Sequence, residues 1–239
     1  MEPITNYKLF KNGVIACIPT LLGYWAIGFA CGAIGTVSGF TILQVFCLSF
    51  FVYAGSAQFL FYSLCSTGAD LLQIALGIAF INIRYLLINT YMAQFFNHAN
   101  LFEKLIGGFL ITDETFGVAS QYAIKNQNKL PFPWLLGLNV TAWLSWIAAT
   151  VFGATFATAL PDWLRDSLSF SLVGMFVGLL LLGWYASQSK KIDIIVILIA
   201  IIVVTASHGH IASNISTMIA TFIAATIGMI MLLRREKVK

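Results

Sequence analysis

The strongest constraint on this chain is a succession of apolar runs, each about as long as a helix that crosses a membrane. A hydrocarbon core about 30 Å thick is spanned by about 20 residues of helix. The chain is 59% hydrophobic and 9% charged, whereas a soluble domain is about 25% charged. We therefore expect an all-α polytopic integral membrane protein with about eight hydrophobic helices that cross seven or eight times. The predicted helices cover residues 13–35, 40–66, 71–95, 105–124, 134–158, 168–186, 192–207 and 211–233.

The connections between these runs are too short for a soluble domain, so residues 1–239 are expected to form one transmembrane domain. The first helix is long and lacks a small-residue cleavage site, so no cleavable signal peptide is expected. The cysteines show no metal-type or disulfide-type spacing. We predict no metal and no cofactor, and the net charge of +4 does not suggest a nucleic-acid partner.

Lysines and arginines in short loops indicate which loops are cytoplasmic. Eight spans with a cytoplasmic N-terminus place ten such residues inside and two, Lys104 and Arg165, outside. Seven spans with the N-terminus outside place nine of these residues inside and three outside. The segment 105–124 is the weakest span because Asp113 and Glu114 lie at its middle. Both topologies place the C-terminus in the cytoplasm.

The two halves of the chain show a weak similarity that suggests a three-helix repeat. Aligning Gly32 and Ala33 with Gly153 and Ala154 places residues 52–59 opposite residues 173–180. Seven spans would make the repeats inverted, and eight would make them parallel. Inverted repeats with the substrate at the midplane are a common transporter plan.

The first helix carries one proline and a series of glycines. Pro19 removes one helical hydrogen bond and should kink the helix. Gly28 and Gly32 form a GxxxG step that lets another helix approach closely, and Gly23 is assigned to the same kink and packing group. Tight packing and a hinge beside a transport pathway are both compatible with this pattern.

The second apolar run carries polar residues at its centre, in the stretch FVYAGSAQFLFY of residues 51–62. On a regular helix Ser56 and Gln58 lie about 200° apart, so they cannot both face one cavity. An unpaired amide facing lipid would be costly. Either Gln58 bonds to a neighbouring helix, or the helix breaks near Gly55 and re-aims both side chains. Broken helices at the midplane coordinate polar substrates in many transporters.

Arg84 lies deep in the third apolar run, where an ionisable residue normally faces the bundle interior and has a partner. The intramembrane carboxylates that could pair with it are Asp113 and Glu114. Two alternatives stay open. Arg84 forms a structural pair with one of them, or it holds a substrate carboxylate by a bidentate contact while an acid is protonated and released. His208 and His210 are too few for a closed zinc site and suggest an extracytoplasmic turn or a pH-sensitive cap.

The order of these motifs resembles the AzlC family, most strongly over residues 13–120. Cys31 departs from the expected small or apolar residue. The residues that carry the resemblance are, in chain order, Pro19, Gly23, Tyr24, Gly28, Phe29, Ala30 and Gly32, then the string YAGSAQF at 53–59, then Asn82, Arg84 and Tyr85.

The resemblance implies the large subunit of a bacterial inner-membrane exporter of branched-chain amino acids and methionine, which works with a small AzlD-like membrane subunit and is not an enzyme. No GxxxxGK[ST] phosphate loop occurs, so we favour proton-coupled secondary transport. An aliphatic amino acid needs an apolar pocket, an anion site such as Arg84 or a half-helix N-terminus, and acceptors for its ammonium. The predicted substrate-binding residues are Tyr53, Ala54, Gly55, Ser56, Gln58, Phe59, Asn82 and Arg84, and the proton-coupling candidates are Asp113 and Glu114.

A passive channel or facilitator for a small neutral or weakly acidic solute is the main alternative. An intramembrane serine hydrolase that uses Ser56 with His208 or His210 lacks the G-x-S-x-G motif. An accessory subunit without its own substrate site is disfavoured, because its buried polar residues would cost stability without serving transport.

Overall fold

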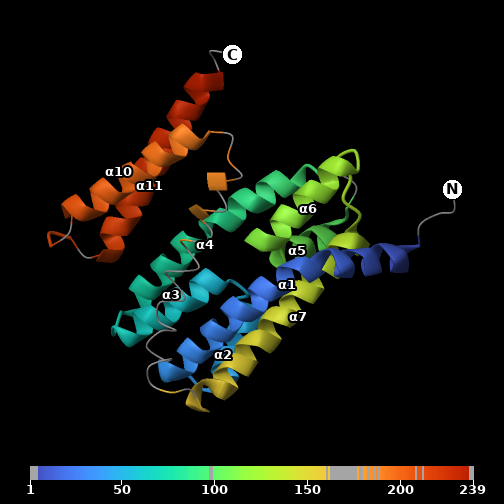
Figure 1. Cartoon of the computed structure of the whole chain (residues 1–239), viewed down its shortest axis with the longest axis horizontal. Helices are drawn as coiled ribbons and strands as arrows, with labels where there is room; N and C mark the ends of the chain where they lie inside the picture. Colours follow the sequence, from blue (N-terminus) through green and yellow to red (C-terminus); the bar gives the residue numbers. More distant parts are fainter. Residues whose placement is uncertain are drawn as a thin grey trace. The chain divides into compact units, whose positions relative to one another are not determined.

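The computed structural model describes residues 5–96, 99–159, 189–207, 209–211 and 213–236, together with 161, 177, 180, 181, 184, 185 and 187. These residues are all helical or in connections, which confirms the predicted all-α fold (Figure 1). Contacts divide the chain into a first unit, Met1–Leu172, and a second unit, Val173–Lys239. His208 and most of the predicted helix at 168–186 lie outside the described residues, so the repeat that uses residues 173–180 stays a prediction.

The first unit contains seven described α-helices, of which α1, α4 and α7 are long and apolar enough to cross a membrane. The bounds are α1 (Asn6–Val37), α2 (Ile42–Phe51), α3 (Gly55–Ser66), α4 (Leu71–Ala93), α5 (Leu101–Phe109), α6 (Asp113–Lys125) and α7 (Phe132–Phe156), followed by a 3₁₀ turn, η1 (Ala157–Ala159).

The core of the first unit is a pair of parallel helices, α1 and α7, whose backbones touch (Figure 1). A methyl group added at Gly32 would lie 1.8 Å from the carbonyl oxygen of Thr150, and one added at Gly153 would lie 2.0 Å from that of Phe29. Near the start of both helices, a methyl group at Gly13 would be equally obstructed by the α7 backbone. Small residues that let backbones approach are a main source of helix association in membranes.

Of the four residues assigned to kinking and packing in α1, Gly28 and Gly32 face α7. Gly23 is exposed, and a methyl group added there would meet no described atom within 4 Å, so the packing role expected for it is not found. The helix continues through Pro19, and the N-terminal part of α1 points in a different direction from the rest (Figure 1). A missing proline N–H accounts for such a bend.

The apolar run at 40–66 is broken, as its polar centre suggested, but the two halves fold back on each other. α2 begins beside the end of α1, where Val45 reaches Gly35, and ends where its backbone accepts the indole N–H of Trp143. α3 returns to the starting end, where Tyr62 also reaches Gly35. The pair α2–α3 is therefore a re-entrant hairpin, which enters and leaves at one end of the unit.

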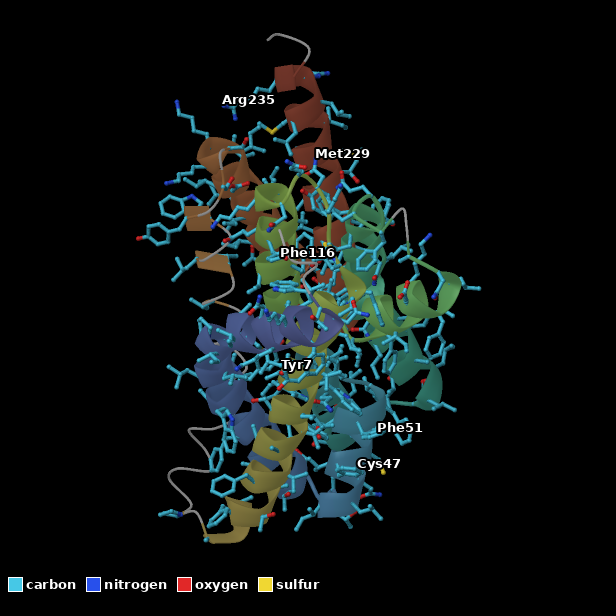
Figure 2. The ribbon with its side chains drawn as sticks, turned by 90° about the vertical axis from the view of Figure 1, so that its right-hand side faces the viewer. Tyr7, Cys47, Phe51, Phe116, Met229 and Arg235 are labelled. Atoms are coloured by element: carbon cyan, nitrogen blue, oxygen red, sulfur yellow. The ribbon has the colours of Figure 1, made fainter. Side chains whose placement is uncertain are left out.

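The tip of this hairpin has an unusual backbone. Tyr53 adopts a positive φ of 43°, which is uncommon for a residue with a side chain and costs about 1–3 kcal/mol. A methyl group at Gly55 would lie 2.7 Å from Cη2 of Trp146, so the tip packs against α7 only with glycine there. On the outer side of α2, the side chains of Cys47 and Phe51 point away from the unit (Figure 2).

The helices α5 and α6 form a second hairpin at the opposite end. α4 runs back to the end where α1 begins, and there the Asn89 amide donates to the Gly108 carbonyl of α5. After a break at residues 110–112, α6 returns to the same end, where Tyr122 stacks on Trp134 at the start of α7 with ring centroids 3.9 Å apart.

One order of elements therefore occurs twice in the first unit, in opposite directions. A long helix is followed by a short helix that begins with a capping box, a break, and another short helix, first in α1–α3 and then in α4–α6. The four short helices have 9 to 13 residues, too few to span the apolar core separately. Where the sequence predicted single crossing helices at 40–66 and 105–124, the structure has two hairpins, because each run turns back at its polar centre.

These hairpins gather the lysines of the first unit at the end where α1 and α7 begin. The opposite end carries Asp70 and, among the described residues, no lysine or arginine. Lys104 therefore joins the other lysines, whereas eight straight crossings had placed it on the opposite side. The lysines at this end are Lys8, Lys11, Lys104, Lys125 and Lys129.

The second unit is described mainly by two helices, α10 (Lys190–Ser207) and α11 (Ser213–Glu236). Arg235 Nη1, near the end of α11, donates to Ser189 Oγ before α10 at 2.7 Å, and Ser207 is hydrogen-bonded to Ser216 at the other end. The two helices are therefore antiparallel. His210 lies in the turn between them.

Candidate functional site

Polar side chains from three helices meet where the tips of the two hairpins come together. Arg84, near the middle of α4, pairs with Asp113 at the start of α6, with 2.8 Å between Nη1 and Oδ2. Its Nη2 donates to Ser56 Oγ in the first turn of α3 at 2.5 Å. The sequence left the partner of Arg84 open between two carboxylates, and the structure selects Asp113. An ionisable residue near the middle of a membrane-spanning helix, as Arg84 is in α4, is a candidate for a functional site.

The N-terminus of α3 lies beside Arg84 and has no side-chain cap. Its N-cap residue is Ala54, and its first turn holds no acidic residue. The first backbone N–H groups of a helix lack intrahelical partners and carry partial positive charge. Together with the guanidinium they make a spot that favours an anion. The start of α6 differs, because Thr112 caps it and Asp113 and Glu114 occupy its first turn.

Several polar atoms in this region are buried without a hydrogen-bond partner. They include Arg84 Nε, which lies near Tyr53, a residue that is 3% exposed. Asn82 Oδ1 is also unpaired, but Asn82 lies about 200° around α4 from Arg84 and joins a different face. Buried polar groups are normally satisfied by protein, water or ligand, so the open positions around Arg84 fit a small polar ligand.

Tyr24 of α1 joins the tip of the second hairpin to the core. Its side chain is buried, and its hydroxyl lies 2.5 Å from Thr112 Oγ1 and donates to Glu114 Oε2 at 3.2 Å. Sequence reasoning gave neither Tyr24 nor Thr112 a role in the site. A threonine directly before two acidic residues is a helix N-cap signal and could have revealed the break, whereas nothing local indicates which hydroxyl on α1 meets it.

Gln58 is placed away from this cluster, in a closed network between four helices. Its amide donates to Ser49 Oγ at 3.1 Å and accepts the indole N–H of Trp146 at 2.9 Å. Thr150 donates to the same serine at 2.8 Å, and Cys31 lies 3.6 Å from the Gln58 oxygen. Since α3 is regular from Gly55 onward, Ser56 faces α4 while Gln58 faces α1 and α7. Gln58 thus bonds to neighbouring helices, one of the two alternatives that the sequence left open.

The remaining predicted binding residues line the same segment. Ala54 and Phe59 are both buried, the first at the tip of the hairpin and the second in the second turn of α3. The hydroxyl of Ser56, which a hydrolase would need beside a histidine, accepts a hydrogen bond from a guanidinium instead.

Comparisons with known proteins agree on one family. The sequence model described as AzlC protein matches residues 19–160, which hold both hairpins and the Arg84 cluster. Inner membrane protein YgaZ of Escherichia coli (strain K12) is 26% identical over 192 residues, 79% of this chain and 78% of its own length. An uncharacterized membrane protein of Archaeoglobus fulgidus is 28% identical over 185 residues, 76% of this chain and 78% of its own length. No solved structure matches the chain.

The matched segment is more than half of the chain, and the similar proteins are named as membrane proteins. The apolar helices α1, α4 and α7 agree with those names. This protein is therefore a membrane protein that belongs to the AzlC family.

Proposed function

We propose that this protein is the large subunit of an inner-membrane exporter that releases branched-chain amino acids and methionine in exchange for protons. Membership of the AzlC family supports a transporter-like role. The observation that carries the proposal is the meeting of two hairpins, which enter from opposite ends, at the cluster of Arg84, Ser56 and Asp113.

The cluster suits the headgroup of an amino acid. Arg84 and the uncapped N-terminus of α3 offer donors for a carboxylate. The acidic first turn of α6 offers acceptors for an ammonium group. The substrate carboxylate would take the place beside Ser56 and the unpaired Arg84 Nε, with Tyr53, Ala54 and Phe59 around it.

The hairpins suit alternating access. Each reaches the cluster from one end only, so movement of α2–α3 would open the site to one side and movement of α5–α6 to the other. Helices broken near the midplane serve this purpose in secondary transporters. The apolar residues of an aliphatic substrate would follow the headgroup into the space between the tips.

The lysine-rich end of the first unit is assigned to the cytoplasm by the positive-inside rule. By this rule, the N-terminus and the base of the α5–α6 hairpin face the cytoplasm. The base of the α2–α3 hairpin faces the outer side. The C-terminus follows the basic end of α11, with Arg234 and Arg235, and is also assigned to the cytoplasm. A small AzlD-like subunit would complete the transporter.

Efflux of preloaded labelled leucine, isoleucine, valine and methionine from cells without their own exporters tests the proposal. The chain is expressed with and without the small subunit. The double variant Arg84→Ala/Asp113→Asn removes both members of the charge pair together, and Lys104→Ala, exposed at the base of α5, is the matched control.

We expect the wild type and Lys104→Ala to accelerate efflux only with the small subunit, and the double variant to be inactive at equal membrane levels. Lack of efflux of all four amino acids by the complete transporter contradicts the proposal. Efflux that uncouplers leave unchanged, without counterflow, supports the passive channel instead.

A further inference from the structure

The cluster between the hairpin tips has two adjacent carboxylates but one cation. Away from the two ends of the first unit, the charged residues that the structure describes are Arg84, Asp113 and Glu114. Their formal charges leave one negative charge in excess. A carboxylate without a cation beside it is costly inside a membrane protein, so a proton or an ammonium group beside the cluster lowers that cost.

The two carboxylates are held differently. Asp113 is engaged by the Arg84 guanidinium at 2.8 Å. Glu114 has no cation within ion-pair distance among the described residues, and its Oε2 accepts a hydrogen bond from the Tyr24 hydroxyl. A neutral hydroxyl orients a carboxylate but does not cancel its charge. The excess charge therefore resides on Glu114.

Titratable groups on several elements lie near enough to Glu114 to interact with its charge. Tyr24 lies on α1, Tyr53 at the tip of the first hairpin, Tyr85 on α4, and Asp113 beside it on α6. Tyr53 is buried, and its hydroxyl lies beside that of Tyr24. The site thus has hydroxyl groups and an acidic neighbour around Glu114, whose carboxylate oxygens can accept hydrogen bonds from an ammonium group.

Resting on the proposed function, we infer that Glu114, positioned by Tyr24, is the carboxylate for which a proton and the substrate ammonium compete, while Asp113 remains the counter-ion of Arg84. Binding of the amino acid from the cytoplasm places its ammonium on Glu114 and releases one proton there. On the outer side a proton protonates Glu114 as the amino acid leaves. One proton enters for each amino acid exported, because one group cannot hold both at once.

The test uses the purified full-length chain with its small subunit in lipid nanodiscs. Infrared difference spectra between acidic and alkaline buffer record the carbonyl stretch of protonated carboxylic acids. The variants are Glu114→Gln, Asp113→Asn and Tyr24→Phe. We expect a titrating band that Glu114→Gln removes and Asp113→Asn retains. Tyr24→Phe should keep the band but shift it to higher frequency, because a hydrogen bond to the carboxyl group is lost.

Leucine added at constant pH should diminish the band in the wild type, since the ammonium displaces the proton. A band that disappears in Asp113→Asn and persists in Glu114→Gln, or the lack of any titrating band, overturns the inference. So does a band that leucine leaves unchanged in a preparation that shows leucine counterflow. Lack of counterflow refutes the proposed function, whereas the variants still decide which carboxylate takes the proton.

Discussion

Replacing Arg84 with alanine tests whether the charge pair between the hairpins is a structural necessity or a substrate site. The substitution leaves Asp113 without the cation that lies 2.8 Å away. Removing one partner of a buried ion pair costs about 3–5 kcal/mol. Each of the two side chains is 28% exposed, so water or headgroups can reach them in part, and we expect the lower end of this range, about 3 kcal/mol.

The double variant Arg84→Ala/Asp113→Asn removes the lone charge and should regain about 2 kcal/mol of the loss. The assay is unfolding by denaturant in detergent micelles, with tryptophan fluorescence as the signal, for the wild type, both single variants and the double variant. The four free energies form a double-mutant cycle. Equal stability of Arg84→Ala and the wild type, or a double variant less stable than Arg84→Ala, would refute the reasoning. If the double variant is stable but does not transport, the Arg84–Asp113 pair serves transport beyond its structural role.

Three further predictions concern packing and topology. Gly32→Ala should lower the free energy of unfolding by about 1–3 kcal/mol, because its methyl group would lie 1.8 Å from the Thr150 carbonyl oxygen. Gly23→Ala, where a methyl group meets no described atom within 4 Å, should change it little. Thermal unfolding compares the two variants, and equal effects would contradict the α1–α7 contact. Gln58→Leu should cost about 1–3 kcal/mol because the Trp146 indole N–H loses its acceptor, while Gln121→Leu, exposed on α6, should be neutral in the same assay. Single cysteines that replace Ser38 and Ala69 in a cysteine-free chain should both react with an impermeant maleimide from outside, and those that replace Ala99 and Lys129 from the cytoplasm only. Labelling of Ser38→Cys and Ala69→Cys from opposite sides would mean that residues 40–66 cross the membrane.

Much of the fold could be predicted from the sequence because apolar length and composition alone decide that a helix is in a membrane. The break near Gly55 was also within reach, since a polar Gly-Ser centre in an apolar run is not consistent with a continuous helix facing lipid. The second break was missed although Thr112 and the acidic residues after it form a helix start. The direction after each break could not be predicted, because it depends on distant contacts such as that of Tyr62 with Gly35.

The sequence predicted which residues belong to the candidate site better than it predicted how they are arranged. Charge balance indicated that Arg84 needs Asp113 or Glu114, but adjacent residues on a helix point about 100° apart, and only tertiary packing decides which one reaches the guanidinium. The same holds for Ser56 and Gln58. Their types suggested a polar site, and the regular α3 helix then sent one toward α4 and the other into a network with Trp146 and Ser49.

The inverted arrangement of the hairpins explains why the site lies where it does. In each hairpin the first short helix ends at the tip and the second begins there. The N-termini of α3 and α6 therefore both lie near Arg84. Two helix N-termini and a guanidinium attract negative charge to one place. On the α6 side the chain supplies that charge itself, through Asp113 and Glu114, whereas the start of α3 has neither a cap nor an acidic residue. Under the proposed function, a carboxylate substrate would bring the anion that the start of α3 lacks, and its ammonium group would lie at the acidic start of α6.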